Sequence, residues 1–324
     1  MGSPPRATGD GVCADRRAVL LMGPTGAGKS ALAVDLARRF PLEIVSVDSA
    51  LVYRGMDIGT AKPDVDTRRA VPHHLIDIRD PVESYSAGEF VLDAAAVMED
   101  IWSRGRQPLF VGGTMLYFHA LSNGIAELPE GNLAVRAEID ARATALGWEQ
   151  VHRELAEVDP EAAVRIHCND SQRIQRALEV FRVTGEPISR LQKLRHSVLA
   201  GVDVVEIAVA PRERSVLHAR IEGRFAAMLR AGFVDEVRLL RERKDLDAEH
   251  PSMRAVGYRQ VWRYLAGHCA LNEAVDQAIV ATRQLAKRQF TWLRAREYAR
   301  WVDSSQNDAI SGLIIALSEQ GIFE

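Results

Sequence analysis

Short apolar runs in the first third of the chain alternate with longer segments of helical pattern. Each run is too short for a helix, so we interpret the runs as buried strands. They are Ala18–Met22, Leu42–Val47, His74–Ile78 and Pro108–Val111. Ala31–Phe40 predicts a helix after the first strand, and a capping box from Ser86 to Glu89 opens another helix, which ends near Gly105. Strands that alternate with helices predict a parallel, covered sheet and hence an α/β fold.

The middle of the chain has a different pattern, because only helical segments occur from about Thr114 to Leu199. These segments are Leu133–Leu146, Trp148–Glu157, Glu161–His167, Ser171–Val183 and Pro187–Leu194. The apolar run Val202–Val209 then predicts a return to the sheet. Further helices are expected around Val216–Ala231, Val234–Arg243, Ala255–Leu265 and Asn272–Arg300. The pattern therefore predicts an α/β core that carries an all-helical insertion.

The length of 324 residues and the apolar fraction of 47% allow a substantial core. We expect a disordered tail at residues 1–17, a core with C-terminal helices at 18–120 and 200–324, and the insertion domain at 121–199. The tail lacks an apolar h-region, and no uncharged run approaches the ~20 residues of a membrane span. We predict a monomer that acts in the cytoplasm and has no membrane partner.

The net charge of −3 conceals a basic segment, since residues 281–300 contain six Lys or Arg residues and one Glu. A nucleic acid partner is therefore not excluded by the average charge. The cysteines, Cys13, Cys168 and Cys269, are far apart and form no CxxC or Cys/His cluster. This spacing disfavours a disulfide framework and a zinc site, and it fits a reducing compartment.

The clearest chemical signal lies between the first predicted strand and the first predicted helix. Eight residues there match GxxxxGK[ST], in the strand-turn-helix context that a phosphate-binding P-loop requires. They are Gly23, Pro24, Thr25, Gly26, Ala27, Gly28, Lys29 and Ser30. Backbone N–H groups and the helix N-terminus would surround phosphate oxygens, Lys29 would add a cation, and the Ser30 hydroxyl is a candidate Mg²⁺ ligand. A glycine-rich turn without a ligand is the weaker alternative.

The identity of the phosphate ligand stays open at this level. Kinases and NTPases usually carry an apolar strand that ends in a metal-binding Asp, whereas Leu109–Val111 is followed by two glycines and Thr114. Asp48 follows the strand Leu42–Val47 and is an alternative metal ligand, but that edge of a sheet also places substrate groups. The missing Asp weakens an ATPase interpretation without removing it.

Six strings of residues, in their order along the chain, carry a resemblance to a known family. They are Asp48–Pro63, His73–Asp77, Val111–Tyr117, Asp170–Val180, Arg254–Arg259 and Lys287–Arg294. With the P-loop they resemble the tRNA dimethylallyltransferase (tRNA isopentenyltransferase) family, over nearly everything from residue 19 to about residue 301. The C-terminus carries no Cys/His zinc finger, so the resemblance is to the bacterial type. Family loops commonly have Ala-Ser where this chain has Gly26 and Ala27, so one potential hydroxyl contact is missing.

The resemblance implies transfer of a dimethylallyl group from dimethylallyl diphosphate to N6 of the adenosine 3′-adjacent to the anticodon (A37) of tRNA, with Mg²⁺ and release of diphosphate. The partners would be the anticodon stem-loop and the prenyl diphosphate, which would occupy a P-loop nucleoside-triphosphate-hydrolase-like core in place of ATP. The RNA would be gripped between core and insertion, with the target base extruded toward Asp48.

The candidate catalytic residues are Asp48, Thr114 and Arg220. Asp48 is the expected base for the proton that the amine loses, and the alternative is an Asp that caps a turn. Thr114 would approach phosphate or nucleotide, and its alternative is a helix N-cap. Arg220 and Arg224 share one helix face, for which a solvated basic stripe is the alternative; the resemblance favours Arg220 as the diphosphate clamp.

Candidate tRNA contacts rest on the resemblance and on the polar face of the last long helix. They are Asp48, Ser49, Ala50, Leu51, Thr114, Arg136, Gln172, Arg173, Ile174, Gln175, Arg176, Arg254, Gly257, Tyr258, Arg259, Lys287, Arg288, Gln289, Thr291, Trp292 and Arg294. A polar helix face is normally only solvated, which is the alternative for this set. His73 and His74 are adjacent in a predicted strand and would point to opposite faces, so we interpret them as structural.

Two rival functions remain at this point. A prenyltransferase for free adenine nucleotides (adenylate isopentenyltransferase) would share the P-loop but would have little use for Gln172–Arg176 and Lys287–Arg294. A small-molecule kinase or ATP-dependent RNA-binding protein would consume the γ-phosphate of ATP. A comparison of tRNA with AMP as acceptor separates the first rival, and ATP consumption identifies the second.

Overall fold

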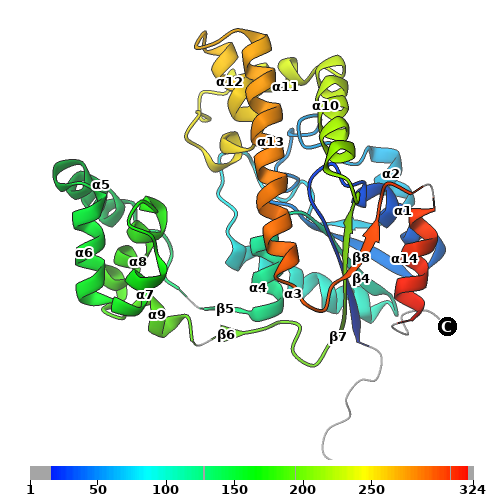
Figure 1. Cartoon of the computed structure of the whole chain (residues 1–324), viewed down its shortest axis with the longest axis horizontal. Helices are drawn as coiled ribbons and strands as arrows, with labels where there is room; N and C mark the ends of the chain where they lie inside the picture. The colour runs from blue at the N-terminus through cyan, green and yellow to red at the C-terminus, as the bar shows by residue number, and fades with distance from the viewer. Residues whose placement is uncertain (1–15, 127, 194, 307, 320–324) are drawn as a thin grey trace, which may run out of the picture. The chain divides into compact units, whose positions relative to one another are not determined.

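Figure 1 shows the computed structural model of the chain, which describes residues 16–126, 128–193, 195–306 and 308–319. The chain forms two compact units. One comprises the segments up to His119 and from Leu199, and the other comprises Ala120–Val198. The predicted tail lies outside the described residues as far as residue 15. Arg17 already belongs to the first strand, so the tail prediction is wrong at its end.

The first unit is built on a six-stranded sheet in which all neighbouring strands are parallel. Its strands are β1 (Arg17–Met22), β2 (Leu42–Val47), β3 (His73–His74), β4 (Gln107–Gly112), β7 (Asp203–Ala210) and β8 (Arg300–Asp303). Their order across the sheet is β3-β2-β4-β1-β7-β8. Parallel neighbours need crossover connections, which explains the helices between the strands. The predicted α/β fold with a parallel sheet is confirmed.

Both faces of the sheet are covered. On one face, Val19 of β1 packs in a buried cluster with Leu36 of α1 (Lys29–Arg39) and Leu313 of α14 (Ala309–Ser318). α3 (Ala87–Ser103) packs against β2 and β4 but contributes no residue to that cluster, so it covers the opposite face. Because alternate strand residues point to opposite faces, Leu20 is buried on the α3 side.

The strand expected at His74–Ile78 is wrong beyond its first residue. Leu75 and Asp77 adopt left-handed φ angles of 61° and 59°, so the chain leaves the extended conformation after His74. The Asp77 carboxylate accepts hydrogen bonds from Lys62 Nζ at 2.5 Å and from Arg68 Nη1 at 2.6 Å. Both partners lie outside the expected strand, and their contacts stabilise a turn at Asp77.

The helices at the C-terminal end also differ from the expected ones. The helix expected at Asn272–Arg300 is α13 (Leu271–Arg294), and Arg300 instead begins the edge strand β8. The helix expected at Ala255–Leu265 starts only at Tyr258, as α12 (Tyr258–Leu265), because Gly257 has a φ of 96°. A short 3-10 helix, Pro251–Arg254, precedes that break. β8 and α14 were not predicted.

The remaining helices that begin in this unit are α2 (Val65–Ala70), α4 (Met115–Asn123), α10 (Arg214–Arg230) and α11 (Phe233–Arg241). α10 and α13 lie side by side (Figure 1), and Leu217 and Ile221 of α10 pack with Ala286 of α13. Within the described ranges, no helix is long and apolar enough to cross a membrane.

The second unit has its own buried core. Its described helices are α5 (Leu133–Leu146), α6 (Trp148–Val158), α7 (Pro160–Arg165), α8 (Ser171–Thr184) and α9 (Ile188–Leu191). Ile139, Leu155 and Ile174 are fully buried in its centre. The short antiparallel pair of β5 (Ile125–Ala126) and β6 (Arg195–His196) was not predicted. α9 is shorter than the expected segment Pro187–Leu194, whose last residue lies outside the described residues.

Candidate active site

The P-loop joins the end of β1 to the start of α1. Gly26 and Gly28 have left-handed φ angles of 80° and 87°, which side-chain-bearing residues rarely adopt. A Cβ atom on Gly23 would lie 2.2 Å from the carbonyl oxygen of Val209 in β7, so the loop also packs closely against the sheet. Gly28 is the N-cap of α1 and has no side chain to satisfy the first N–H groups of the helix. These free donors suit an anion.

Lys29 is the cation inside this loop. The residue is 9% exposed, and its Nζ donates a hydrogen bond to the carbonyl oxygen of Pro24 at 2.8 Å. Burial lowers the pKa of Lys29 to about 7, the Asp48 carboxylate opposes this effect, and the Arg224 guanidinium adds to it. A bound polyanion would favour the charged form of the lysine.

The two arginines of α10 have different surroundings. Arg220 donates to the carbonyl oxygen of Ala27 at 3.5 Å, to Ser304 Oγ at 3.1 Å and to the Ser304 carbonyl oxygen at 2.7 Å. Its guanidinium therefore links the P-loop to Ser304, which directly follows β8. Arg224 donates one hydrogen bond, to the carbonyl oxygen of Thr60 at 2.9 Å. Burial lowers the pKa of Arg224, and the Asp48 carboxylate opposes this.

The Asp48 carboxylate opposes the lowering of the pKa of both Arg224 and Lys29. The Arg220 guanidinium instead donates its hydrogen bonds to backbone and hydroxyl oxygens. Sequence reasoning selected Arg220 of the pair. The spacing of four residues showed that the two side chains share a face, but it did not show which partners each guanidinium has.

Asp48 stands directly after β2, beside the P-loop. Its Oδ1 accepts a hydrogen bond from the backbone N–H of Ala50 at 2.8 Å and a longer one from Leu51 at 3.4 Å. One carboxylate oxygen of Asp48, Oδ1, therefore caps a turn, as the alternative interpretation of this residue expects. No hydrogen bond within the described part of the chain engages Oδ2. This fixed orientation leaves one carboxylate oxygen for a ligand.

Thr114 connects two strand ends at the same edge of the sheet. Its backbone N–H donates to the carbonyl oxygen of Val47 at 3.2 Å, and its Oγ1 accepts from the backbone N–H of Ser49 at 3.1 Å. Since Ser49 follows Asp48, Thr114 aligns the loop that carries the candidate base. Its hydroxyl therefore lies beside Asp48, at the edge where α/β sheets bind ligands.

Three of the expected tRNA contacts have buried side chains, and for these side chains the expectation is wrong. Ile174 belongs to the core of the second unit. The Tyr258 hydroxyl donates to Glu236 Oε1 at 2.6 Å inside the first unit. Gln289 is 6% exposed and bonds to the P-loop and to Gly113. A side chain packed in this way is not available to RNA.

Other expected contacts in the second unit already have hydrogen-bonding or ionic partners within that unit. Glu179 is fully buried; burial acts against its ionisation, but hydrogen bonds from Arg136 and Arg176 hold its pKa below the usual value. Gln175 Nε2 donates to Asp140 Oδ1 at 2.6 Å. Gln172 and Arg173 at the start of α8 are exposed, and Arg173 pairs with Asp170 at 3.4 Å at the surface. They are therefore the members of this group that a large ligand can reach.

The outer face of α13 is the most extended of the expected contact surfaces. Its exposed members are Lys287, Arg288, Thr291, Trp292 and Arg294. A cavity of about 370 Å³ lies between α10 and α13. Its lining residues are Arg214, Leu217, His218, Val280, Arg283, Gln284, Ala286, Lys287, Phe290, Thr291 and Arg294, none of them acidic. Outside this helix, Arg259 is exposed, and the exposed Arg254 pairs with Glu249 at 3.1 Å.

The site offers few ligands for a metal ion. Among the residues that the structure describes, no group of three His, Cys, Asp or Glu side chains could hold one. Ser30 lies exposed in the first turn of α1. His73 and His74 bind the carbonyl oxygen of Val71 and the Glu43 carboxylate, as structural residues do. The donor set therefore fits only an ion that its substrate largely coordinates, as Mg²⁺ often is.

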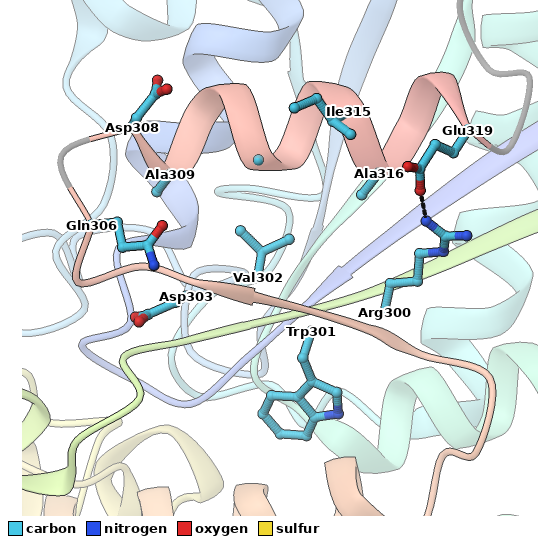
Figure 2. A pocket seen from close by; sticks show the side chains of 11 residues that line it. Arg300, Trp301, Val302, Asp303, Gln306, Asp308, Ala309, Ile315, Ala316 and Glu319 are labelled. Atoms are coloured by element: carbon cyan, nitrogen blue, oxygen red, sulfur yellow. Dashed lines mark hydrogen bonds and ion pairs between the residues drawn. The ribbon is translucent and has the colours of Figure 1, made fainter.

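A cavity of about 570 Å³ lies between β8 and α14. Figure 2 shows the side chains that line it. Val302 points toward α14, Trp301 points away from it, and Arg300 pairs with Glu319 at one end. None of the residues expected to act in catalysis or binding lines this cavity. We assign it no part in the active site.

Comparison with known proteins gives concordant results. A family model described as IPP transferase matches residues 51–296. The tRNA isopentenylpyrophosphate transferase of Bacillus halodurans is 36% identical, with a TM-score of 0.67, covering 94% of this chain and 98% of that chain. The tRNA delta(2)-isopentenylpyrophosphate transferase of Staphylococcus epidermidis is 30% identical, with a TM-score of 0.66 and coverages of 94% and 100%. A eukaryotic dimethylallyltransferase that acts on tRNA is 26% identical, with a TM-score of 0.78 and coverages of 95% and 79%.

Proposed function

This chain belongs to the IPP transferase family, and we propose that its P-loop holds the diphosphate of the prenyl donor while Asp48 receives the proton of the acceptor amine. The chain transfers a dimethylallyl group from dimethylallyl diphosphate to N6 of the tRNA adenosine 3′-adjacent to the anticodon, A37. The observation that supports these roles is the P-loop with its buried Lys29, at the same edge of the sheet as the Asp48 carboxylate, which the turn at Ala50 holds by one oxygen.

The leaving diphosphate gains charge as the bond between carbon and oxygen breaks. Backbone N–H groups at the start of α1 and the Lys29 ammonium stabilise that charge without reorganising, because the loop already holds them in place. We assign the role of a second cation to Arg224, since its guanidinium has only one described hydrogen bond. Arg220 supports the loop through Ala27 and Ser304.

The acceptor amine needs activation, because the lone pair of adenine N6 is delocalised into the ring. Asp48 accepts a hydrogen bond from N6, orients it and takes its proton as the new bond between nitrogen and carbon forms. The turn at Ala50 fixes the carboxylate, and Thr114 fixes the loop. The reaction thus yields the prenylated adenosine and inorganic diphosphate, and the proton released from N6 is held on Asp48.

We propose Mg²⁺ as the cofactor, held chiefly by diphosphate oxygens with the Ser30 hydroxyl as the protein ligand. Such an ion supplies charge neutralisation for the leaving group. The exposed position of Ser30 in the first turn of α1 supports this assignment.

We also propose that tRNA contacts the exposed face of α13, Arg259, and Gln172 and Arg173 of α8. The cavity between α10 and α13 combines cations with the Phe290 ring, and Arg294 lies over that ring at 5.7 Å. Cations next to an aromatic ring suit a phosphate and an unstacked base. The free cysteines Cys168 and Cys269 fit a reducing compartment, and we keep a cytoplasmic monomer as our proposal.

The choice of acceptor is tested with dimethylallyl diphosphate and either tRNA or AMP. Mass spectrometry of the nucleosides should show prenylated adenosine from tRNA, since the exposed cations of α13 suit a polyanion. A tRNA whose A37 is replaced by guanosine serves as the control and should remain unmodified. Prenylation of AMP with tRNA left unchanged would contradict the proposal.

A further inference from the structure

Gln289 is a polar side chain in the interior, and it is 6% exposed. It lies on α13, between residues whose side chains reach solvent, such as Arg288. Its Oε1 accepts a hydrogen bond from the backbone N–H of Thr25 at 2.9 Å, and its Nε2 donates to the carbonyl oxygen of Gly113 at 2.8 Å. One amide therefore satisfies two backbone groups from two different loops.

The partners determine the orientation of this amide. The Thr25 N–H can only donate and the Gly113 carbonyl can only accept, so the oxygen of Gln289 must face the P-loop. The approach to the second loop is close, because a Cβ atom on Gly113 would lie 2.5 Å from Gln289 Nε2. Glycine at this position thus lets the amide bridge the two loops.

The two loops carry the two halves of the proposed reaction. Thr25 belongs to the loop assigned to the diphosphate, and Gly113 precedes Thr114, which aligns the Asp48 loop assigned to the amine. We propose that Gln289 is a positioning residue that sets the distance between the leaving diphosphate and the acceptor amine. This inference rests on the proposed function, and it replaces the direct tRNA contact that the sequence suggested for Gln289.

The expected effect is kinetic. Displacement of reacting groups by ~1 Å can lower a rate by ~10²-fold, while each substrate still binds its own surface. We expect Gln289→Met, which keeps the length but removes both hydrogen bonds, to lower the single-turnover rate by ~10²-fold. Equilibrium affinity for tRNA should stay at the wild-type value. Gln277→Met, an exposed position on the same helix outside the cavity between α10 and α13, is the matched control and should match wild type.

A second variant separates positioning from a loss of packing. In Gln289→Glu, the protonated carboxyl accepts from Thr25 and donates to Gly113 as the amide does, whereas the ionised form has no donor. Burial raises the pKa of such a carboxyl. The ratio of the variant rate to the wild-type rate should therefore be highest at low pH and fall as pH rises. The ratio removes the effects of pH that both proteins share.

The measurements are single-turnover rates, tRNA affinity and the pH dependence of the rate ratio. A wild-type rate in Gln289→Met, or reduced tRNA affinity with an unchanged single-turnover rate, would overturn the positioning role. If Gln289→Met fails to fold, the Gln289→Glu profile decides, and a ratio that does not change with pH would overturn the inference. Failure of the proposed function is distinguishable, because the wild-type protein itself would then transfer no prenyl group to tRNA.

Discussion

The P-loop and the outer face of α13 are both assigned to phosphate groups, yet they are built in opposite ways. In the P-loop, the cation Lys29 is buried and held by a carbonyl oxygen, and Arg220 and Gln289 brace the loop. On α13, Lys287, Arg288 and Arg294 are exposed. The first region recognises a small anion by shape and desolvated charge, and the second attracts a polyanion by the number of its charges. Substitutions should therefore act strongly and locally in the first region, and weakly and with salt dependence in the second.

The largest effect is expected at Asp48. Asn keeps the size and the turn to Ala50 but cannot accept the proton, so Asp48→Asn should lower kcat by ~10²–10⁴. Affinity for tRNA and for the prenyl diphosphate should change little. Single-turnover rates and equilibrium binding on one preparation decide this. A fast chemical step with lost Mg²⁺ dependence and lost diphosphate affinity would instead identify Asp48 as a metal-sphere residue.

The next effect concerns the choice between the arginines of α10. Removal of a charged hydrogen bond to phosphate costs about 1.5–3 kcal/mol. Arg224→Gln should therefore lower kcat/KM for dimethylallyl diphosphate by roughly 10- to 150-fold, the range that corresponds to that energy. Arg230→Gln, exposed near the end of the same helix, is the control and should leave kcat/KM unchanged. If kcat/KM falls equally in Arg224→Gln and Arg230→Gln, Arg224 has no specific role at the diphosphate, and this helix face is only a solvated basic stripe.

A smaller effect follows from the lowered pKa of Lys29, about 7 because of burial. At pH 8 the ligand-free lysine is mostly neutral, and binding of inorganic diphosphate should protonate it. Calorimetry in buffers of different ionisation enthalpy should show uptake of about one more proton by wild type than by Lys29→Arg, which stays charged. Equal proton uptake in both proteins would show that Lys29 is already charged or does not meet the anion.

The lowered pKa of Lys29 also determines whether its contribution to the free energy of unfolding rises or falls with pH. Between pH 7 and the ordinary lysine pKa of 10.5, the unfolded chain binds a proton that the folded chain lacks. The contribution of Lys29 to the free energy of unfolding therefore rises with pH across this window. Chemical denaturation at several pH values should give a less positive slope for Lys29→Met than for wild type. Parallel slopes would contradict the buried, neutral lysine.

The smallest effect is expected on the exposed face of α13. Lys287→Ala should flatten the log–log salt dependence of tRNA affinity by ~0.7–0.9, the contribution of one phosphate contact. Gln277 is exposed and uncharged on the same helix and does not line the cavity between α10 and α13, so Gln277→Ala should leave the slope unchanged. If the salt-dependence slope of tRNA affinity is the same in Lys287→Ala and wild type, Lys287 makes no phosphate contact and this helix face is only solvated.

The predictable features of this molecule are those that local chemistry determines. The glycines of the P-loop and the strands β1, β2 and β4 follow from backbone conformations and apolar runs that neighbouring residues specify. The end of β3 was not predictable, because Lys62 and Arg68 hold Asp77 from outside the strand. β8 was missed because a helical pattern continues past Arg294, where α13 ends.

The errors in the candidate site have the same origin. Ile174, Tyr258 and Gln289 lie in strings that resemble the family, and a string does not reveal which side chains turn inward. Arg220 and Arg224 differ through Ser304 and Thr60, which are distant in sequence, so the role of Arg220 as diphosphate clamp stays a prediction beside our proposal for Arg224. Periodicity identifies a shared face, but tertiary contacts determine what that face meets.

The assignment of the P-loop to the prenyl diphosphate and of the exposed face of α13 to tRNA is tested most directly by measuring the binding of both ligands to variants of each region. Equilibrium affinities for a non-reactive prenyl diphosphate analogue and for tRNA are measured separately on wild type, Lys29→Ala and Lys287→Ala. We expect Lys29→Ala to lose affinity for the analogue and keep its affinity for tRNA, because the buried cation serves only the loop. Lys287→Ala should show the reverse. Loss of tRNA binding in Lys29→Ala with unchanged affinity for the analogue would contradict the assignment of the P-loop to the prenyl diphosphate.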